Sequence, residues 1–154
     1  MKTLWFITNP KSGTATPAKA EALATVFADR GLVLAGRTAF PDDALPTPEA
    51  LDSAGVDTAV LFAGDGTINA AVCALAEWHG TILILPGGTM NMLAKHLHGS
   101  TDSAAIVAAA VEHGRRTSLP YVDVAGHRAF VGLILGPAAT WVRAREMVRA
   151  GRLR

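Results

Sequence analysis

The segment TAVLFAGDGT, residues 58–67, places a glycine turn directly after a continuous apolar run. Such runs are typical of parallel strands that are buried on both faces, and the turn after such a strand leads into a helix. A second segment of the same form, TILILPGGTMN, occupies residues 81–91. The two segments therefore predict neighbouring loops at one edge of a parallel sheet.

The rest of the first 120 residues continues the alternation of strands and helices. We expect further strands at residues 3–8 and 32–38, and helices that begin at Pro17 and Pro48, each after a threonine that can cap it. The other expected helices are residues 68–78, 90–97 and 103–113. This alternation predicts an α/β fold, a doubly wound parallel sheet with helices on both faces.

The pattern changes near residue 119. Residues 121–124 and 129–135 have the character of two strands joined by a tight turn, which predicts an antiparallel pair. Too few residues follow to close an independent β domain. We therefore expect an α/β domain at residues 1–118, and at residues 119–154 a hairpin and a basic helix that begin an incomplete antiparallel β domain.

The composition is that of a globular protein, because 50% of the 154 residues are hydrophobic and 18% are charged. A net charge of +1, without aromatic residues interleaved in a basic stretch, argues against nucleic acid as a partner. The single cysteine excludes an intrachain disulfide, and no apolar run reaches the ~18 residues that a membrane span needs. We expect a cytoplasmic protein.

Polar loops follow three of the expected strands. In open parallel sheets, ligands bind outside the carboxyl ends of the strands, where helix N-termini offer unpaired N–H groups to phosphate. Gly64 and Gly66 can adopt positive φ and let a phosphate approach the backbone, and Thr67 can cap the following helix. The three loops are residues 9–13, 64–67 and 86–91, and together they predict a nucleotide phosphate site.

Asp65 lies between the two glycines of the middle loop. A carboxylate beside phosphates is repulsive unless a divalent cation lies between them or the carboxylate contacts a hydroxyl. Asp65 therefore predicts a magnesium–nucleotide complex. The alternative is a plain turn in which the aspartate bonds its own backbone.

The other two loops add polar groups to the same edge. Lys11 and Ser12 can meet phosphate oxygens, and Thr89 and Asn91 offer a hydroxyl and an amide at a helix start. The chain has no G-x-x-x-x-G-K-[ST] motif, and the middle loop lacks the third glycine of the dinucleotide fingerprint. These absences disfavour P-loop NTPases and Rossmann oxidoreductases.

Taken in order, the three loops resemble the diacylglycerol kinase catalytic domain family, which includes sphingosine, ceramide and bacterial lipid kinases. The matching motifs are Asn9-Pro10-Lys11-Ser12-Gly13, Ala63-Gly64-Asp65-Gly66-Thr67-Ile68-Asn69 and Pro86-Gly87-Gly88-Thr89-Met90-Asn91. The resemblance extends over residues 3–135. Two positions depart from it, because Ala63 replaces the usual first glycine and Met92 stands where many relatives have aspartate.

The resemblance implies an ATP- and magnesium-dependent kinase that phosphorylates a hydroxyl of diacylglycerol or a related lipid. ATP would lie in the cleft between the α/β domain and a following β-sandwich domain. The nucleotide contacts that it implies are Asn9, Ser12, Gly13, Thr38, Gly64, Asp65, Gly66, Thr67, Asn69, Gly87, Gly88, Thr89 and Asn91, and the metal ligand is Asp65. The family's general base is a glutamate that would lie beyond Arg154, so we expect no catalytic base in this chain.

The resemblance also implies a lipid substrate at a membrane surface and a second domain that completes the molecule. If the strands at residues 121–135 lack partners, their unpaired edge predicts self-association. Two alternatives stay open, namely a non-catalytic ATP-binding module or relic of a lipid kinase, and a NAD kinase-like protein. In the basic tail, Trp141, Ala144 and Val148 can form one helical stripe that holds the protein at the inner membrane surface. The alternative is that this helix packs on the second domain.

Overall fold

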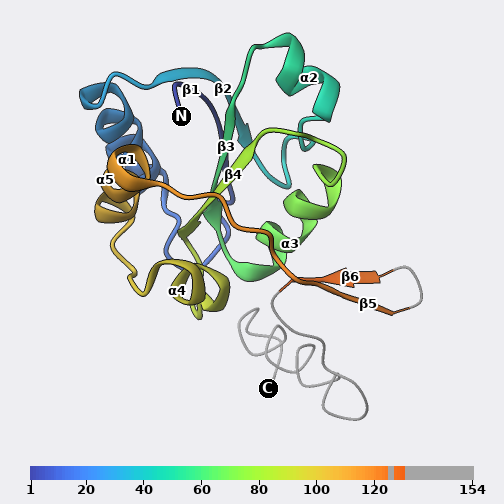
Figure 1. Cartoon of the computed structure of the whole chain (residues 1–154). Coiled ribbons are helices and arrows are strands. Elements are labelled where there is room, and N and C mark those ends of the chain that lie inside the picture. Colours follow the sequence, from blue (N-terminus) through green and yellow to red (C-terminus); the bar gives the residue numbers. More distant parts are fainter. Residues whose placement is uncertain (125–126, 131–154) are drawn as a thin grey trace.

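The computed structural model describes residues 1–124 and 127–130, and their centre is a four-stranded parallel sheet (Figure 1). The strands are β1 (Thr3–Thr8), β2 (Val33–Ala39), β3 (Thr58–Ala63) and β4 (Thr81–Pro86). They lie in the order β2-β1-β3-β4, and every neighbouring pair is parallel. The predicted α/β fold is confirmed.

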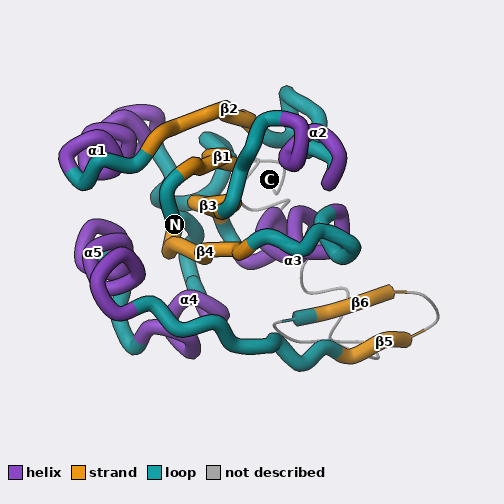
Figure 2. Tube along the Cα trace, turned by 45° about the horizontal axis from the view of Figure 1, so that its top comes forward, coloured by secondary structure: helices purple, strands orange, loops and turns teal. Residues whose placement is uncertain are grey.

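Helices cover both faces of this sheet, as expected (Figure 2). The helices are α1 (Pro17–Asp29), α2 (Pro48–Ser53), α3 (Asp65–Ala74), α4 (Met92–His98) and α5 (Ser103–His113). Helices α1 and α5 pack on one face, and α2, α3 and α4 pack on the other. The sheet is therefore doubly wound, with a hydrophobic core on each side.

The two cores differ in character. On the α1 side, the ring of Phe6 stacks on Phe62 with centroids 6.4 Å apart and meets the edge of Phe27 at 5.2 Å. On the α3 side, aliphatic residues dominate, among them Leu61 and Ile68. All six residues of β3 are buried, whereas β2 is a half-exposed edge strand. β3 is thus continuously apolar because both of its faces are buried, as the sequence predicted.

The start signals of α1 and α2 act as predicted. The Thr16 hydroxyl accepts a hydrogen bond from the N–H of Lys19 at 3.3 Å, and Thr47 accepts one from Ala50 at 3.3 Å. Each helix has proline in its first turn. Gly31 follows α1 with a φ of +68°, in the left-handed region that ends helices.

Helix α3 corrects the prediction of a helix at residues 68–78. It runs from Asp65 to Ala74, with Gly64 as the N-cap residue and no side-chain capping bond. Thr67 is thus inside the first turn, and its predicted role as the cap is wrong. Gly64 has a φ of −81°, and Gly66 is helical, so neither uses the positive φ expected of it.

The short antiparallel pair is β5 (Val122–Val124) and β6 (His127–Ala129), in which Val122 faces Ala129. It confirms an antiparallel pair at this point. The predicted continuation of the second strand to residue 135 and the basic helix lie outside the described residues, and the division at residue 118 stays a prediction. Among the described residues, no helix combines the length and the apolar character that a bilayer span requires.

Candidate functional site

The loops after β1, β3 and β4 meet at the carboxyl edge of the sheet, because these three strands are adjacent. The Asn9 amide donates to the Thr67 hydroxyl at 2.8 Å, and the N–H of Gly64 donates to the Ser12 hydroxyl at 3.2 Å. The N–H of Thr14 donates to the carbonyl of Gly87 at 3.0 Å. The first loop, which in the structure includes Thr14, is therefore hydrogen-bonded to both of the others.

Glycine is required where the loops approach each other. A Cβ added to Gly88 would lie 2.6 Å from the Cα of Gly64, and one added to Gly87 would lie 2.6 Å from the backbone nitrogen of Ala63. A Cβ on Gly13 would lie 2.7 Å from the Thr89 hydroxyl. Real Cβ atoms essentially never lie within 3.0 Å of other heavy atoms, whether backbone or side chain, so these glycines permit the convergence of the loops.

Gly66 is a glycine of another kind. It lies in the first turn of α3, and a Cβ added there would meet no atom within 4 Å. Packing therefore does not demand glycine at this position. The first turn of a helix carries N–H groups without intrahelical partners and a partial positive charge. Gly66 leaves these groups open to an anion.

Asp65 joins the second loop to α4. Its two carboxylate oxygens accept hydrogen bonds from the N–H groups of Met92 and Leu93, each at 3.3 Å. The carboxylate thus caps the first turn of α4, which neither interpretation of the sequence anticipated. The sequence offered no signal for this contact, because the cap lies 27 residues before the helix that it caps.

The Asp65 carboxylate is also the candidate magnesium ligand. The described residues contain no group of three or more His, Cys, Asp or Glu that could hold a metal without help. Mg²⁺ is commonly held by one or two carboxylates together with substrate phosphates and water. An ionised carboxylate has about four lone-pair positions, of which α4 uses two. A single carboxylate at this edge therefore fits an ion that arrives with a nucleotide.

Asn91 shapes the third loop. It is 8% exposed and has a left-handed φ of 52°, which asparagine tolerates better than most residues. Its side-chain oxygen accepts from the N–H of Gly88 at 2.6 Å, and its amide donates to the Gly88 carbonyl at 3.0 Å. The side chain is thus bonded within its own loop, while Thr89 lies exposed at the rim.

Asn69 lies one turn further along α3 and contacts the hairpin. Its amide donates to the carbonyl of Arg128 at 3.0 Å, and its side-chain oxygen accepts from the N–H of Phe130 at 3.0 Å. Asn69 thus takes no part in the hydrogen bonds that join the loops, and its contact with a nucleotide stays a prediction. Instead, Asn69 fastens β6 and the residue after it to α3.

The first loop and β2 hold the two remaining candidates. Thr38 is buried at the end of β2, and its hydroxyl accepts from the Trp5 indole at 2.9 Å. It borders a cavity of about 220 Å³ beside Thr8 and Pro10. The Lys11 ammonium pairs with the exposed Asp42 carboxylate at 2.6 Å. The structure therefore brings Thr38 near the first loop but not into the hydrogen bonds that join the loops.

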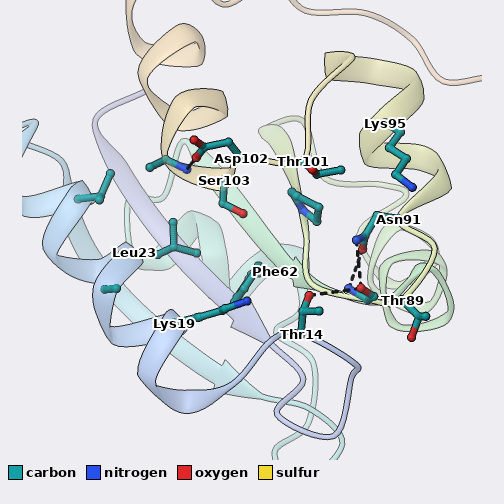
Figure 3. Close-up of a pocket in the computed structure, with 15 residues that line it drawn as sticks. Thr14, Lys19, Leu23, Phe62, Thr89, Asn91, Lys95, Thr101, Asp102 and Ser103 are labelled. Atoms are coloured by element: carbon teal, nitrogen blue, oxygen red, sulfur yellow. Dashed lines mark hydrogen bonds between the residues drawn. The ribbon is translucent and has the colours of Figure 1, made fainter.

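Sequence reasoning missed a larger groove behind the third loop (Figure 3). The groove has a volume of about 530 Å³ and lies between α1, α4 and α5. Its lining includes Gly88, Thr89 and Asn91 of the third loop, and two lysines, Lys19 and Lys95. No local motif marks these lysines, because they are brought together by helices that lie far apart in the sequence.

Comparison with known proteins gives a family and a fold for this chain. The model of the diacylglycerol kinase catalytic domain matches residues 3–124. A diacylglycerol kinase structure from Bacillus anthracis is 24% identical, with a TM-score of 0.59, and the match covers 82% of this chain and 49% of that chain. The comparison with curated proteins finds no match.

Two further structures of diacylglycerol kinase-like proteins from the same organism are each 22% identical, with TM-scores of 0.56 and 0.55. The matches cover 82% of this chain, and 47% and 44% of those chains. The chain thus spans about half the length of the solved structures that it matches, and these likenesses show a shared fold. Because the family model covers most of the sequence and all three loops, the chain belongs to the diacylglycerol kinase catalytic domain family.

Proposed function

We propose that this chain is the nucleotide-binding part of a lipid kinase, which binds magnesium–ATP at the three joined loops. The acceptor would be a hydroxyl of diacylglycerol or a related lipid. The observation that carries the proposal is the bonding of the first loop to both others, through Ser12 to Gly64 and through Thr14 to Gly87. This bonding makes a preorganised polar edge at the place where parallel sheets bind ligands.

The chain's own residues would position the phosphates. The open first turn of α3, at Gly66, offers N–H groups and the positive end of the helix dipole. Asn9 and Ser12 hold this turn in place through Thr67 and Gly64. Phosphoryl transfer depends chiefly on positioning and on neutralisation of charge, so a rigid phosphate site supplies a large part of what the reaction requires.

Asp65 would hold the magnesium ion together with the nucleotide phosphates. The bound ion would neutralise phosphate charge and so lower the barrier to transfer. The carboxylate keeps its hydrogen bonds to α4 in this role, so Asp65 links metal binding to the position of α4 and of the third loop.

The acceptor hydroxyl needs a base to receive its proton. We assign this base to the part of the longer relatives that the chain does not cover. The lipid would be reached at a membrane surface by a peripheral, cytoplasmic protein. The nucleotide site and the lipid site would then come from two parts of one molecule or from associated chains.

Isothermal titration of ATP into the purified chain, with and without Mg²⁺, tests the nucleotide site. We expect binding that requires Mg²⁺ in the wild type and that is lost in Gly66→Ala. Transfer of labelled phosphate from ATP to diacylglycerol in mixed vesicles tests the lipid acceptor. A folded chain that fails to bind ATP at millimolar concentration would contradict the proposal.

A further inference from the structure

The groove behind the third loop has an apolar floor. Phe62 and Leu23 line it, and they are only 2% and 5% exposed, so each presents a small part of its surface to the groove. The Phe62 ring stacks on Phe6, which in turn meets Phe27, so the floor is backed by packed aromatic rings. The volume of about 530 Å³ lies within the range of small-molecule sites.

Two uncompensated positive charges flank this floor. Figure 3 shows Lys19 on α1 and Lys95 on α4 on different sides of the groove. Within the part of the chain that the structure describes, neither ammonium group forms an ion pair, whereas Lys11 pairs with Asp42. The two lysines therefore leave positive charge at an apolar hollow.

Among the residues that the structure describes, Asp102 is the carboxylate that lines the groove, and it is already engaged. Asp102 accepts hydrogen bonds from the N–H groups of Ala104 at 2.9 Å and Ala105 at 3.1 Å, and so caps α5. Capping places this negative charge at the positive end of the helix dipole. The hydroxyls of Thr101 and Ser103 lie at the same end of the groove. The groove thus combines positive charge and hydroxyl groups with an apolar floor.

The backbone of the third loop offers little to a nucleotide base at this side. The N–H and the carbonyl of Gly88 both bond to the Asn91 side chain, and the Gly87 carbonyl accepts from Thr14. Recognition of a base edge depends on free donors and acceptors of this kind. Their prior engagement favours a ligand whose buried part is apolar.

From these observations we propose that the groove binds a phosphate monoester that carries an apolar chain, namely a phosphorylated lipid. A phosphate monoester carries about −1.5 to −2 charges at neutral pH, which matches the two ammonium groups. The apolar chain would lie on the floor formed by Leu23 and Phe62. The choice of a lipid as the ligand rests on the proposed function, because a lipid kinase produces a ligand of this class. The charge and shape of the groove are observed independently of that function.

Titration of dihexanoyl phosphatidic acid into the chain without nucleotide tests this site. The variants Lys19→Ala and Lys95→Ala should each weaken binding about tenfold, since each removes one charged hydrogen-bond donor. Lys2→Ala is the matched control, because Lys2 immediately precedes β1, at the other end of the sheet. This variant should bind as the wild type does.

A second pair of variants tests the floor without changing charge. Ala22 lines the groove and Ala28, also on α1, does not, so Ala22→Phe should block the lipid and Ala28→Phe should not. Unchanged lipid binding in both lysine variants and in Ala22→Phe would overturn the proposal. Equal affinity for dihexanoyl phosphatidylcholine, or for inorganic phosphate, would do the same.

Competition separates this proposal from the nucleotide site. We expect ADP with Mg²⁺ to leave the affinity for dihexanoyl phosphatidic acid unchanged, and Gly66→Ala to lose ATP binding while it keeps lipid binding. Displacement of the lipid by ADP would overturn the assignment of the groove to a lipid. If the chain binds the lipid but not ATP, the proposed function is contradicted, whereas the assignment of the groove to a phosphorylated lipid is supported.

Discussion

The side-chain amide of Asn9 donates a hydrogen bond of 2.8 Å to the hydroxyl of Thr67, across 58 residues of sequence. This contact joins the loop after β1 to the first turn of α3. Asn9→Ala and Thr67→Val should each lower the free energy of unfolding by about 1 kcal/mol, as expected for one partly buried hydrogen bond. Urea denaturation of the two variants measures this loss.

Both variants should also weaken ATP binding, because the first turn of α3 would lose a support. A double-mutant cycle is the control, since removal of both partners should cost less than the sum of the single changes. Additive effects would show that the two side chains act independently.

Asp65 combines a structural contact with the proposed metal contact, and two substitutions separate them. Asp65→Asn keeps an oxygen that can accept from α4, so the variant should stay close to wild type in stability but lose the Mg²⁺ dependence of ATP binding. Asp65→Ala should lose both, with about 1 kcal/mol of stability lost with the cap. Thermal unfolding and titration with and without Mg²⁺ measure the two effects.

Thr47→Ala removes the cap of α2, away from the loops, and provides the control for Asp65→Ala. It should cost a similar amount of stability and leave ATP binding unchanged. If ATP binding depends on Mg²⁺ equally in the wild type and in Asp65→Asn, Asp65 is not a ligand of the metal.

Gly66 and Gly88 are predicted to respond oppositely to the same substitution. Gly66→Ala adds a methyl group in open space and should stabilise the helix by about 0.5 kcal/mol, because glycine is a poor helix former. The same methyl group should obstruct phosphate, so binding should fall while stability rises. Gly88→Ala should destabilise the protein, because its Cβ would lie 2.6 Å from Gly64. Unfolding curves and ATP titrations of both variants test this contrast.

The contacts of Asn69 lead to a prediction about the hairpin of β5 and β6. Asn69→Ala removes two hydrogen bonds to the backbone at Arg128 and Phe130. The amide of Phe130 should therefore exchange its hydrogen faster, and ATP binding should change less than in Asn9→Ala. Hydrogen exchange by mass spectrometry resolves the peptide concerned. Unaltered exchange there would mean that other contacts hold the hairpin.

Acid should weaken the amino edge of the sheet through Asp57. Partial burial by itself would raise the pKa of this carboxyl. Hydrogen bonds from the Thr58 hydroxyl and the N–H groups of Thr3 and Lys2, together with the positive charge of the N-terminus, outweigh burial and lower the pKa below 3.8. A lowered pKa in the folded state means stability that is present above pH 3.8 and lost as the pH falls through the folded value. Asp57→Asn should be less stable at pH 7 than the wild type, and should lose less stability as the pH falls below about 5.

Local signals in the sequence were sufficient for the four parallel strands and for two helix starts, whereas β6 begins at His127, which was expected in the turn. The apolar runs predicted β1 and β3 to the residue, and the Thr-Pro pairs before α1 and α2 predicted their caps. These features depend on residues a few positions apart, so they can be read without knowledge of the fold.

One error, the capping role of Thr67, and two contacts that the sequence did not reveal involve residues distant in the sequence. Thr67 has a hydroxyl suited to capping, but that hydroxyl accepts from Asn9, and the helix begins earlier at a glycine that has no side chain. Asp65 caps a different helix, and Asn69 contacts the hairpin. Nothing in the neighbouring sequence shows such partners, so the convergence of the three loops was predictable while the individual contacts of their residues were not.

In the order β2-β1-β3-β4, β2 is added on one side of β1, and the chain then crosses over β1 to add β3 and β4 on its other side. The loop after β1 consequently leads to α1 on one face, and the loop after β3 leads to α3 on the opposite face. Two loops that leave adjacent strands in opposite directions open a crevice between them, which is a topological switch point. The location of the proposed site is thus a property of how the chain is wound, so substitutions in the loops should tune or abolish binding but should not move it.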